Sequence, residues 1–92
     1  YLGVNYYMRI SANLALGTLS NVKAGGYTSP PGIEMTEMGW QIYPPGFHQV
    51  LMRLHRDFGK PLYVTENGCC DSGDDVRRRY LLSHWAAMQK AI

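Results

Sequence analysis

The residues best placed for chemistry close the segment Leu62–Gly68, where strand-forming side chains end on the carboxylate of Glu66 and the chain turns at Asn67-Gly68. A carboxylate at the end of a buried strand is held by rigid backbone and points into the mouth of the sheet. Glycoside hydrolysis needs such a group, because one ionised oxygen must meet an oxocarbenium-like centre while a second carboxylic acid protonates the leaving group. From its position alone, Glu66 could also be an exposed residue at the end of a strand, followed by an ordinary turn, and this alternative stays open.

Two strands and two helices are predicted to position this carboxylate. They span about residues 2–7 (strand), 46–58 (helix), 61–65 (strand) and 75–92 (helix). Gly59 ends the first helix, and Asp74 or Asp75 can cap the second. The order strand, helix, strand, helix predicts a parallel pair of strands joined by a crossover helix.

Each predicted helix has one apolar side. On the first helix it comprises Phe47, Val50, Leu51, Leu54 and Phe58, and on the second Val76, Tyr80, Leu81, His84, Ala87, Met88 and Ala91. Tyr80 and Trp85 are both expected to be packing residues. Tyr6 and Tyr7 point to opposite faces of the first strand, and we assign Tyr6 to the face behind the sheet.

A loop of unusual length, residues 8–44, separates the first strand from the first helix. Long loops of this sort are usually functional or disordered, and this one leaves the carboxyl end of a strand, the side where α/β barrels place their sites. The chain begins at Tyr1 and ends at Ile92 inside a predicted helix, and a parallel sheet is normally covered on both faces. We therefore expect it to be part of something larger.

Composition argues against several classes of partner. Nine Lys and Arg against seven Asp and Glu give a formal charge of +2, too small and too interspersed for nucleic-acid or membrane binding. The cluster Arg77–Arg79 is interpreted as a solvated helix face rather than a phosphate site. No apolar run is long enough to span a bilayer. The histidines have no metal-ligand spacing, so no metal site is predicted.

Cys69 and Cys70 are adjacent, which strains an ordinary disulfide between them, so we expect free thiols that fill space rather than act as nucleophiles. Free thiols and the lack of a visible signal peptide favour a cytoplasmic location. The compartment stays open, because a leader could precede Tyr1.

Three separated motifs in a fixed order resemble glycoside hydrolase family 1. They are Gly3-Val4-Asn5-Tyr6-Tyr7, the string Glu37–Gly46 and the strand that ends Thr65-Glu66-Asn67-Gly68, and the segment Leu54–Pro61 and the tail Asp74, Arg77, Tyr80-Leu81, His84 also fit. The resemblance covers nearly all 92 residues. It implies an α/β fold, namely the sixth and seventh βα units of a (β/α)₈ TIM barrel, or about two of its eight units.

By this resemblance, Glu66 is the nucleophile of a retaining β-glycosidase and forms a covalent glycosyl-enzyme. The hydroxyl of Tyr7 would hydrogen-bond and orient the nucleophile, and Asn5 would point into the same pocket. Trp40 would form a stacking wall for the leaving-group side, although without the resemblance it is more often a loop anchor. The implied substrate is a small carbohydrate or aryl β-glycoside, with no cofactor.

Two departures from the family pattern qualify this expectation. The acid/base glutamate, in a Thr-x-Asn-Glu-Pro context on an earlier strand, has no counterpart here, and the link 69–73 is shorter than in relatives. We therefore expect the remainder of the barrel to be needed for folding and activity. The alternatives are a truncated or degenerate glycosidase without activity and, more weakly, a small α/β interaction module.

Overall fold

The computed structural model describes residues 1–11 and 31–92. The elements follow in the order β1 (Leu2–Tyr6), α1 (Pro44–Phe58), β2 (Leu62–Asn67) and α2 (Asp75–Ala91). These bounds differ by at most two residues from those predicted from the sequence. Much of the predicted loop 8–44, namely 12–30, lies outside the described residues.

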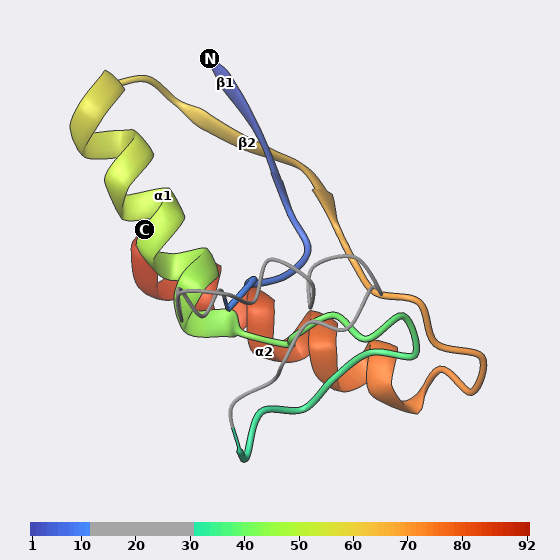
Figure 1. Ribbon diagram of the computed structural model, residues 1–92. Helices are drawn as coiled ribbons and strands as arrows, with labels where there is room; N and C mark the ends of the chain where they lie inside the picture. Colours follow the sequence, from blue (N-terminus) through green and yellow to red (C-terminus); the bar gives the residue numbers. More distant parts are fainter. Residues whose placement is uncertain (12–30) are drawn as a thin grey trace.

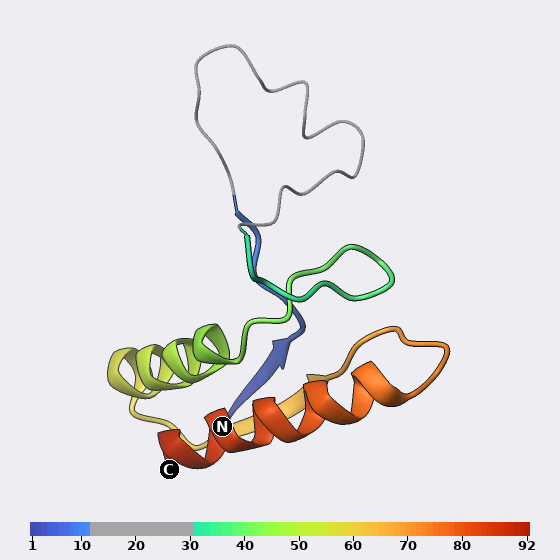
Figure 2. The ribbon, with the colours of Figure 1, turned by 90° about the horizontal axis from the view of Figure 1, so that it is seen from below.

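β1 and β2 pair in parallel and form a two-stranded sheet, with α1 as the crossover between them (Figure 1). Parallel neighbours need such a crossover, because the chain must return to the same end of the sheet. The described residues that follow the carboxyl ends of β1 and β2 lie on one side of the molecule (Figure 2). The predicted α/β architecture of two βα units is confirmed.

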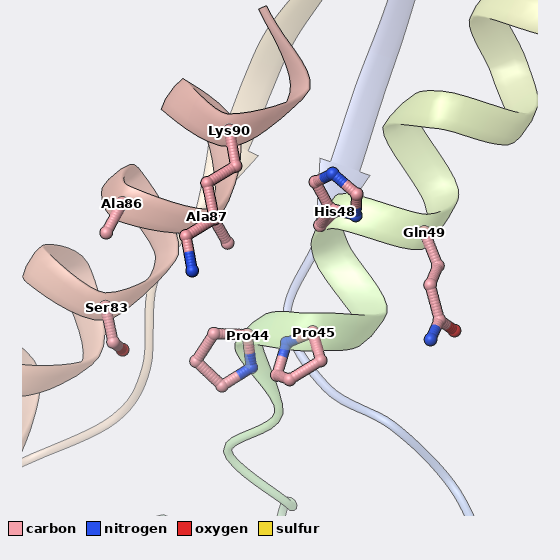
Figure 3. Close-up of a pocket in the computed structure, with 8 residues that line it drawn as sticks. All are labelled: Pro44, Pro45, His48, Gln49, Ser83, Ala86, Ala87 and Lys90. Atoms are coloured by element: carbon pink, nitrogen blue, oxygen red, sulfur yellow. The ribbon is translucent and has the colours of Figure 1, made fainter.

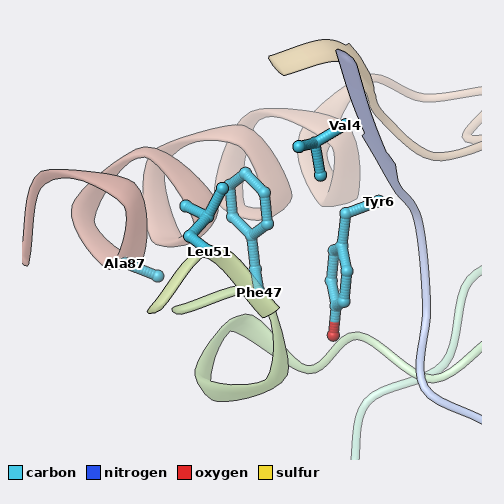
Figure 4. Close-up of a cluster of buried hydrophobic side chains, with 5 residues drawn as sticks. All are labelled: Val4, Tyr6, Phe47, Leu51 and Ala87. Atoms are coloured by element: carbon cyan, nitrogen blue, oxygen red, sulfur yellow. The ribbon is translucent and has the colours of Figure 1, made fainter. Parts of the chain in front are cut away.

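The core lies between the sheet and the two helices (Figure 4). It contains Val4, Tyr6, Phe47, Leu51 and Ala87. The Tyr6 ring stacks on Phe47 with centroids 5.0 Å apart, which confirms that Tyr6 packs behind the sheet. On the opposite face, Asn5, Tyr63 and Thr65 are exposed, so both helices cover the same face of the sheet.

Helix α1 begins close to β1, where a hydrogen bond and a contact that requires glycine join the two elements. The Tyr6 hydroxyl donates a hydrogen bond to the main-chain carbonyl of Tyr43, at 2.8 Å. A Cβ on Gly46 would lie 2.5 Å from that hydroxyl oxygen, so the approach requires glycine. The helix ends at Gly59, which adopts the left-handed conformation with φ of 58° and donates its N–H to the carbonyl of His55.

Helix α2 is capped by Asp71 and not, as the sequence suggested, by Asp74 or Asp75. The Asp71 carboxylate accepts the main-chain N–H groups of Val76 and Arg77 at 2.9 and 3.1 Å. These bonds, above all that from Arg77, hold the pKa of Asp71 below its ordinary value. Asp74 occupies the cap position with a positive φ of 62° and makes no side-chain cap bond. The usual rule places the capping side chain at the cap position itself, so it does not identify a carboxylate three residues earlier.

Two apolar side chains expected to pack are exposed. Trp85 is 54% exposed, because it lies about 100° around the helix from the buried side chain of His84 and about 140° from that of Tyr80. Phe58 is 57% exposed, since contact with the core weakens along the last turn of α1. Neither of the two helices is long and apolar enough to cross a membrane.

Candidate active site

Glu66 lies at the carboxyl end of β2, where an irregularity turns its side chain to the open face of the sheet. Strict alternation from Val64 would point Glu66 toward the helices. Instead, the register shifts between Val4 and Asn5, so that Asn5 pairs with Glu66 and Thr65 is the extra residue. A bulge of this kind re-aims side chains and is frequent beside active sites. Glu66 is consequently exposed on the face that Asn5 occupies.

The carboxylate of Glu66 accepts a hydrogen bond from the hydroxyl of Tyr7. Tyr7 directly follows β1, so the carboxyl ends of the two strands meet through this bond. The hydrogen bond to Glu66 raises the pKa of Tyr7. Tyr7 therefore remains protonated, as a donor, through neutral and mildly alkaline pH.

The main chain at Tyr7 is fixed by Tyr80 on α2. The Tyr80 hydroxyl donates to the Tyr7 carbonyl at 2.8 Å and accepts a bond from the Asn67 side-chain amide at 3.2 Å. Asn67 also donates to the carbonyl of Tyr6 at 2.8 Å. Burial raises the pKa of Tyr80, and its ring stacks on His84 with centroids 3.8 Å apart. Sequence reasoning gave Tyr80 a packing role only, although a buried tyrosine usually finds a partner for its hydroxyl.

Asn5 and Trp40 complete the group predicted from the sequence. The Thr65 hydroxyl donates to the Asn5 side-chain oxygen at 2.6 Å, which fixes the side chain of Asn5 beside its register partner Glu66. The Trp40 ring meets the Tyr7 ring edge-on, with centroids 6.0 Å apart. Glu66, Tyr7 and Trp40 thus form a continuous row of contacts, and Asn5 joins it through the pairing of the strands.

The remaining carboxylates are engaged elsewhere, and all seven Asp and Glu lie within the described residues. Five of the other six carboxylates have hydrogen-bond or ion-pair partners: Glu34 with Arg79, Glu37 with Ser72, Asp57 with Arg53 and Arg56, Asp71 with main-chain N–H groups at the start of α2, and Asp74 with Arg77. Asp75 lies in the first turn of α2. Within residues 1–11 and 31–92, no three His, Cys, Asp or Glu side chains gather as metal ligands do.

Cys69 and Cys70, just beyond Glu66, are both free thiols, as expected. Burial raises the pKa of the Cys69 thiol, which disfavours the thiolate. Its main-chain carbonyl instead accepts a 3.3 Å hydrogen bond from Arg77, so this part of the chain is structural.

A groove between α1 and α2 lies away from Glu66 (Figure 3). It has a volume of about 270 Å³ and is lined only by residues that belong to the two helices. These residues are Pro44, Pro45, His48, Gln49, Ser83, Ala86, Ala87 and Lys90. Since no residue of either strand reaches it, this groove is not the site around Glu66.

Comparisons with known proteins converge on one family. Residues 1–92 match the sequence profile of Glycosyl hydrolase family 1. The whole chain is 34% identical to a beta-galactosidase from Pyrococcus woesei and 33% identical to the aryl-phospho-beta-D-glucosidase BglH from Bacillus subtilis, of which it covers 21% and 22%. A solved hyperthermophilic beta-glucosidase from Pyrococcus furiosus superposes on 97% of the chain with a TM-score of 0.73 and 30% identity, over 20% of its own length.

The chain spans about a fifth of the length of the relatives it matches. Its alignment with the Pyrococcus woesei protein runs over 106 positions, more than the 92 residues present here. The matched region of that relative is therefore longer than this chain.

Proposed function

Because this chain belongs to glycosyl hydrolase family 1, we propose that it forms the sixth and seventh βα units of a retaining β-glycosidase barrel in which Glu66 is the nucleophile. The observation that carries the proposal is the hydrogen bond from Tyr7 to Glu66. It orients an exposed carboxylate at the carboxyl end of a parallel strand, where barrel enzymes perform their chemistry.

In the first step, a Glu66 oxygen attacks the anomeric carbon, and the bond from that carbon to the leaving-group oxygen breaks. The products are a glycosyl ester on Glu66 and an alcohol or phenol, whose oxygen takes a proton from a general acid. In the second step, water attacks the same carbon and gives one proton to the group that acted as general acid, while the ester bond breaks and Glu66 is regenerated as a carboxylate. Two inversions give net retention of configuration. Tyr7 orients the attacking carboxylate in both steps.

The proton donor belongs to another unit of the barrel. Within this chain, Glu66 is the carboxylate that a tyrosine orients, whereas five of the other six are held by partners elsewhere. Retaining enzymes place their two carboxyl groups roughly 5 to 5.5 Å apart. The isolated chain therefore holds the nucleophile and its orienting tyrosine but not the acid/base group.

We assign the substrate to β-linked glucosides or galactosides, including aryl β-glycosides. Asn5 lies beside Glu66 and would face the sugar, while Trp40 lies beyond Tyr7 and would face the leaving group. An aromatic side chain suits that side, because aryl groups and the apolar faces of sugars pack on a π surface. This chemistry requires no metal or organic cofactor.

The test compares the isolated chain with a complete barrel that carries these residues. The complete barrel is expected to hydrolyse an aryl β-glucoside or β-galactoside and to release the β-anomer first, as seen by proton NMR. The isolated chain is expected to show no turnover, since general acid catalysis alone contributes about 10²- to 10⁴-fold. Turnover by the isolated chain that Glu66→Gln abolishes, or first release of the α-anomer by the barrel, would contradict the proposal.

A further inference from the structure

Trp40 is carried by a short antiparallel hairpin, residues 34–42, which we call the Trp40 hairpin. Its arms are joined by main-chain hydrogen bonds from Ile42 to Glu34 and from Thr36 to Trp40, at 2.9 and 2.8 Å. Gly39 makes the turn with a positive φ of 73°. The hydroxyl oxygen of Thr36, a buried residue, accepts the Trp40 N–H at 3.1 Å. The main chain at Trp40 is therefore fixed relative to the rest of the hairpin.

The base of this hairpin is attached to the segment that follows β1. Gln41 is 1% exposed, and its side-chain oxygen accepts a hydrogen bond from Arg9 at 2.8 Å. Its amide nitrogen donates to the Ser11 hydroxyl at 3.0 Å. Arg9 also lies 3.6 Å from the centroid of the Tyr43 ring, a cation–π contact. One end of the hairpin is thus held by a buried polar contact.

The tip of the hairpin is attached to the other strand's connection, residues 68–74. One carboxylate oxygen of Glu37 accepts both the main-chain N–H and the hydroxyl of Ser72, at 2.9 and 2.6 Å. Figures 1 and 2 both show the hairpin (green) beside this connection (orange). The Ser72 hydrogen bonds hold the pKa of Glu37 below its ordinary value, so the carboxylate is ionised at neutral pH.

We propose that Glu37 and Ser72 form a latch that positions the Trp40 hairpin across the carboxyl end of β2 and thereby fixes the leaving-group side of the site. This inference rests on the proposed function. Glu37 is a positioning residue in this scheme, since it acts through Trp40. A second contact of the hairpin, the ion pair between Glu34 and Arg79 at 2.7 Å, is exposed like the latch, but it leads to helix α2 and not to the connection that follows β2. The latch joins the Trp40 hairpin to the connection that follows β2, through two hydrogen bonds that Ser72 donates to one oxygen of Glu37.

The latch is expected to matter only for substrates whose leaving group reaches Trp40. An aryl β-glucoside has such a leaving group, and its ring can pack on the indole. A β-glucosyl fluoride does not, because its leaving group is a single atom. Loss of the latch should therefore slow hydrolysis of the aryl β-glucoside selectively, while a general loss of folding would slow hydrolysis of both substrates.

The experiment uses a complete barrel that carries these residues, with the variants Glu37→Ala, Ser72→Ala and both together. Glu37→Ala is expected to raise KM for the aryl β-glucoside about three- to tenfold and to change β-glucosyl fluoride hydrolysis by less than about twofold. Ser72→Ala should have a smaller effect, since the main-chain N–H remains. The double variant should match Glu37→Ala, because one interaction is lost in both. Glu37→Gln should recover much of the wild-type KM, since it keeps an acceptor oxygen.

Asp57→Ala is the matched control, because it also removes an exposed carboxylate, but one at the carboxyl end of α1, whereas the Trp40 hairpin precedes the amino end of that helix. A second readout is hydrogen exchange of the Trp40 hairpin amides, which Glu37→Ala should accelerate and Asp57→Ala should not. Equal effects on both substrates, or unchanged KM and unchanged exchange, would overturn the latch. A wild-type barrel that hydrolyses neither substrate would overturn the proposed function instead, and the exchange measurement would still decide whether the latch exists.

Discussion

The hydroxyl of Tyr7, just beyond β1, donates a hydrogen bond to the carboxylate of Glu66, 59 residues later at the end of β2. The two groups meet because parallel pairing brings both carboxyl ends to one edge and because the irregularity at Thr65 turns Glu66 to the open face. On α2, Tyr80 then fixes the main chain of Tyr7. The orientation of the carboxylate thus depends on all three elements.

Tyr7→Phe in a complete barrel should lower kcat/KM for an aryl β-glucoside by about one to two orders of magnitude. The variant keeps the ring that meets Trp40 and removes only the donor to Glu66. Steady-state kinetics measure the effect. Tyr63→Phe, which removes a hydroxyl near the amino end of β2, is the control. Equal losses in the two variants, or no loss in Tyr7→Phe, would rule out the orienting role.

The sequence predicted the elements because local signals specify them, whereas the site residues came from the resemblance to the family and their roles stay predictions. Strand-forming residues that end on Glu66, and a helix that ends at Gly59, determine the order of the elements. The predicted cap of α2 by Asp74 or Asp75 and the predicted packing of Trp85 were wrong, because the first depends on how the link before α2 folds and the second on which side of that helix meets α1.

The contacts between distant loops had no local signal at all. Glu37 and Ser72 lie 35 positions apart, and nothing in the residues around either one indicates the other. The same is true of the Tyr80 hydroxyl, whose acceptor is a main-chain carbonyl 73 positions earlier. Main-chain acceptors are common to every residue, so residue types alone cannot identify them.

His84 should make stability fall as pH is lowered through the weakly acidic range. Burial lowers the pKa of His84. Below about pH 6.5 the imidazole therefore binds a proton in the unfolded chain more readily than in the folded protein. Stability is unaffected at higher pH, where both states are neutral, and decreases by at most about 1.4 kcal/mol per pH unit below it.

Melting temperatures of a complete barrel between about pH 7.5 and 5 test this expectation. His84→Phe keeps a ring against Tyr80 and should flatten the pH dependence. His55→Gln, on the exposed side of α1, should leave it unchanged. An identical pH dependence in wild type and His84→Phe would show that His84 is not responsible.

Gly46→Ala should destabilise the protein by about 1–3 kcal/mol, because the new methyl group would meet the Tyr6 hydroxyl oxygen at 2.5 Å. Denaturant unfolding measures the loss. Tyr6→Phe should cost less in the Gly46→Ala background than in wild type, since the clashing hydroxyl is then absent. Gly68→Ala is the control, with nothing within 4 Å of its Cβ. Additive effects of Gly46→Ala and Tyr6→Phe would refute the predicted contact.

The role of Glu66 is tested most directly by the configuration of the product that azide gives with Glu66→Ala. In a complete barrel, this variant should lose hydrolysis of ordinary glycosides by several orders of magnitude, because no group can form the glycosyl ester. Azide should enter the vacated space and partly restore cleavage of an activated aryl β-glucoside. One displacement then replaces two, so the product should be the α-glucosyl azide, with inverted configuration. A product of retained configuration, or near wild-type hydrolysis by Glu66→Ala, would show that Glu66 is not the nucleophile.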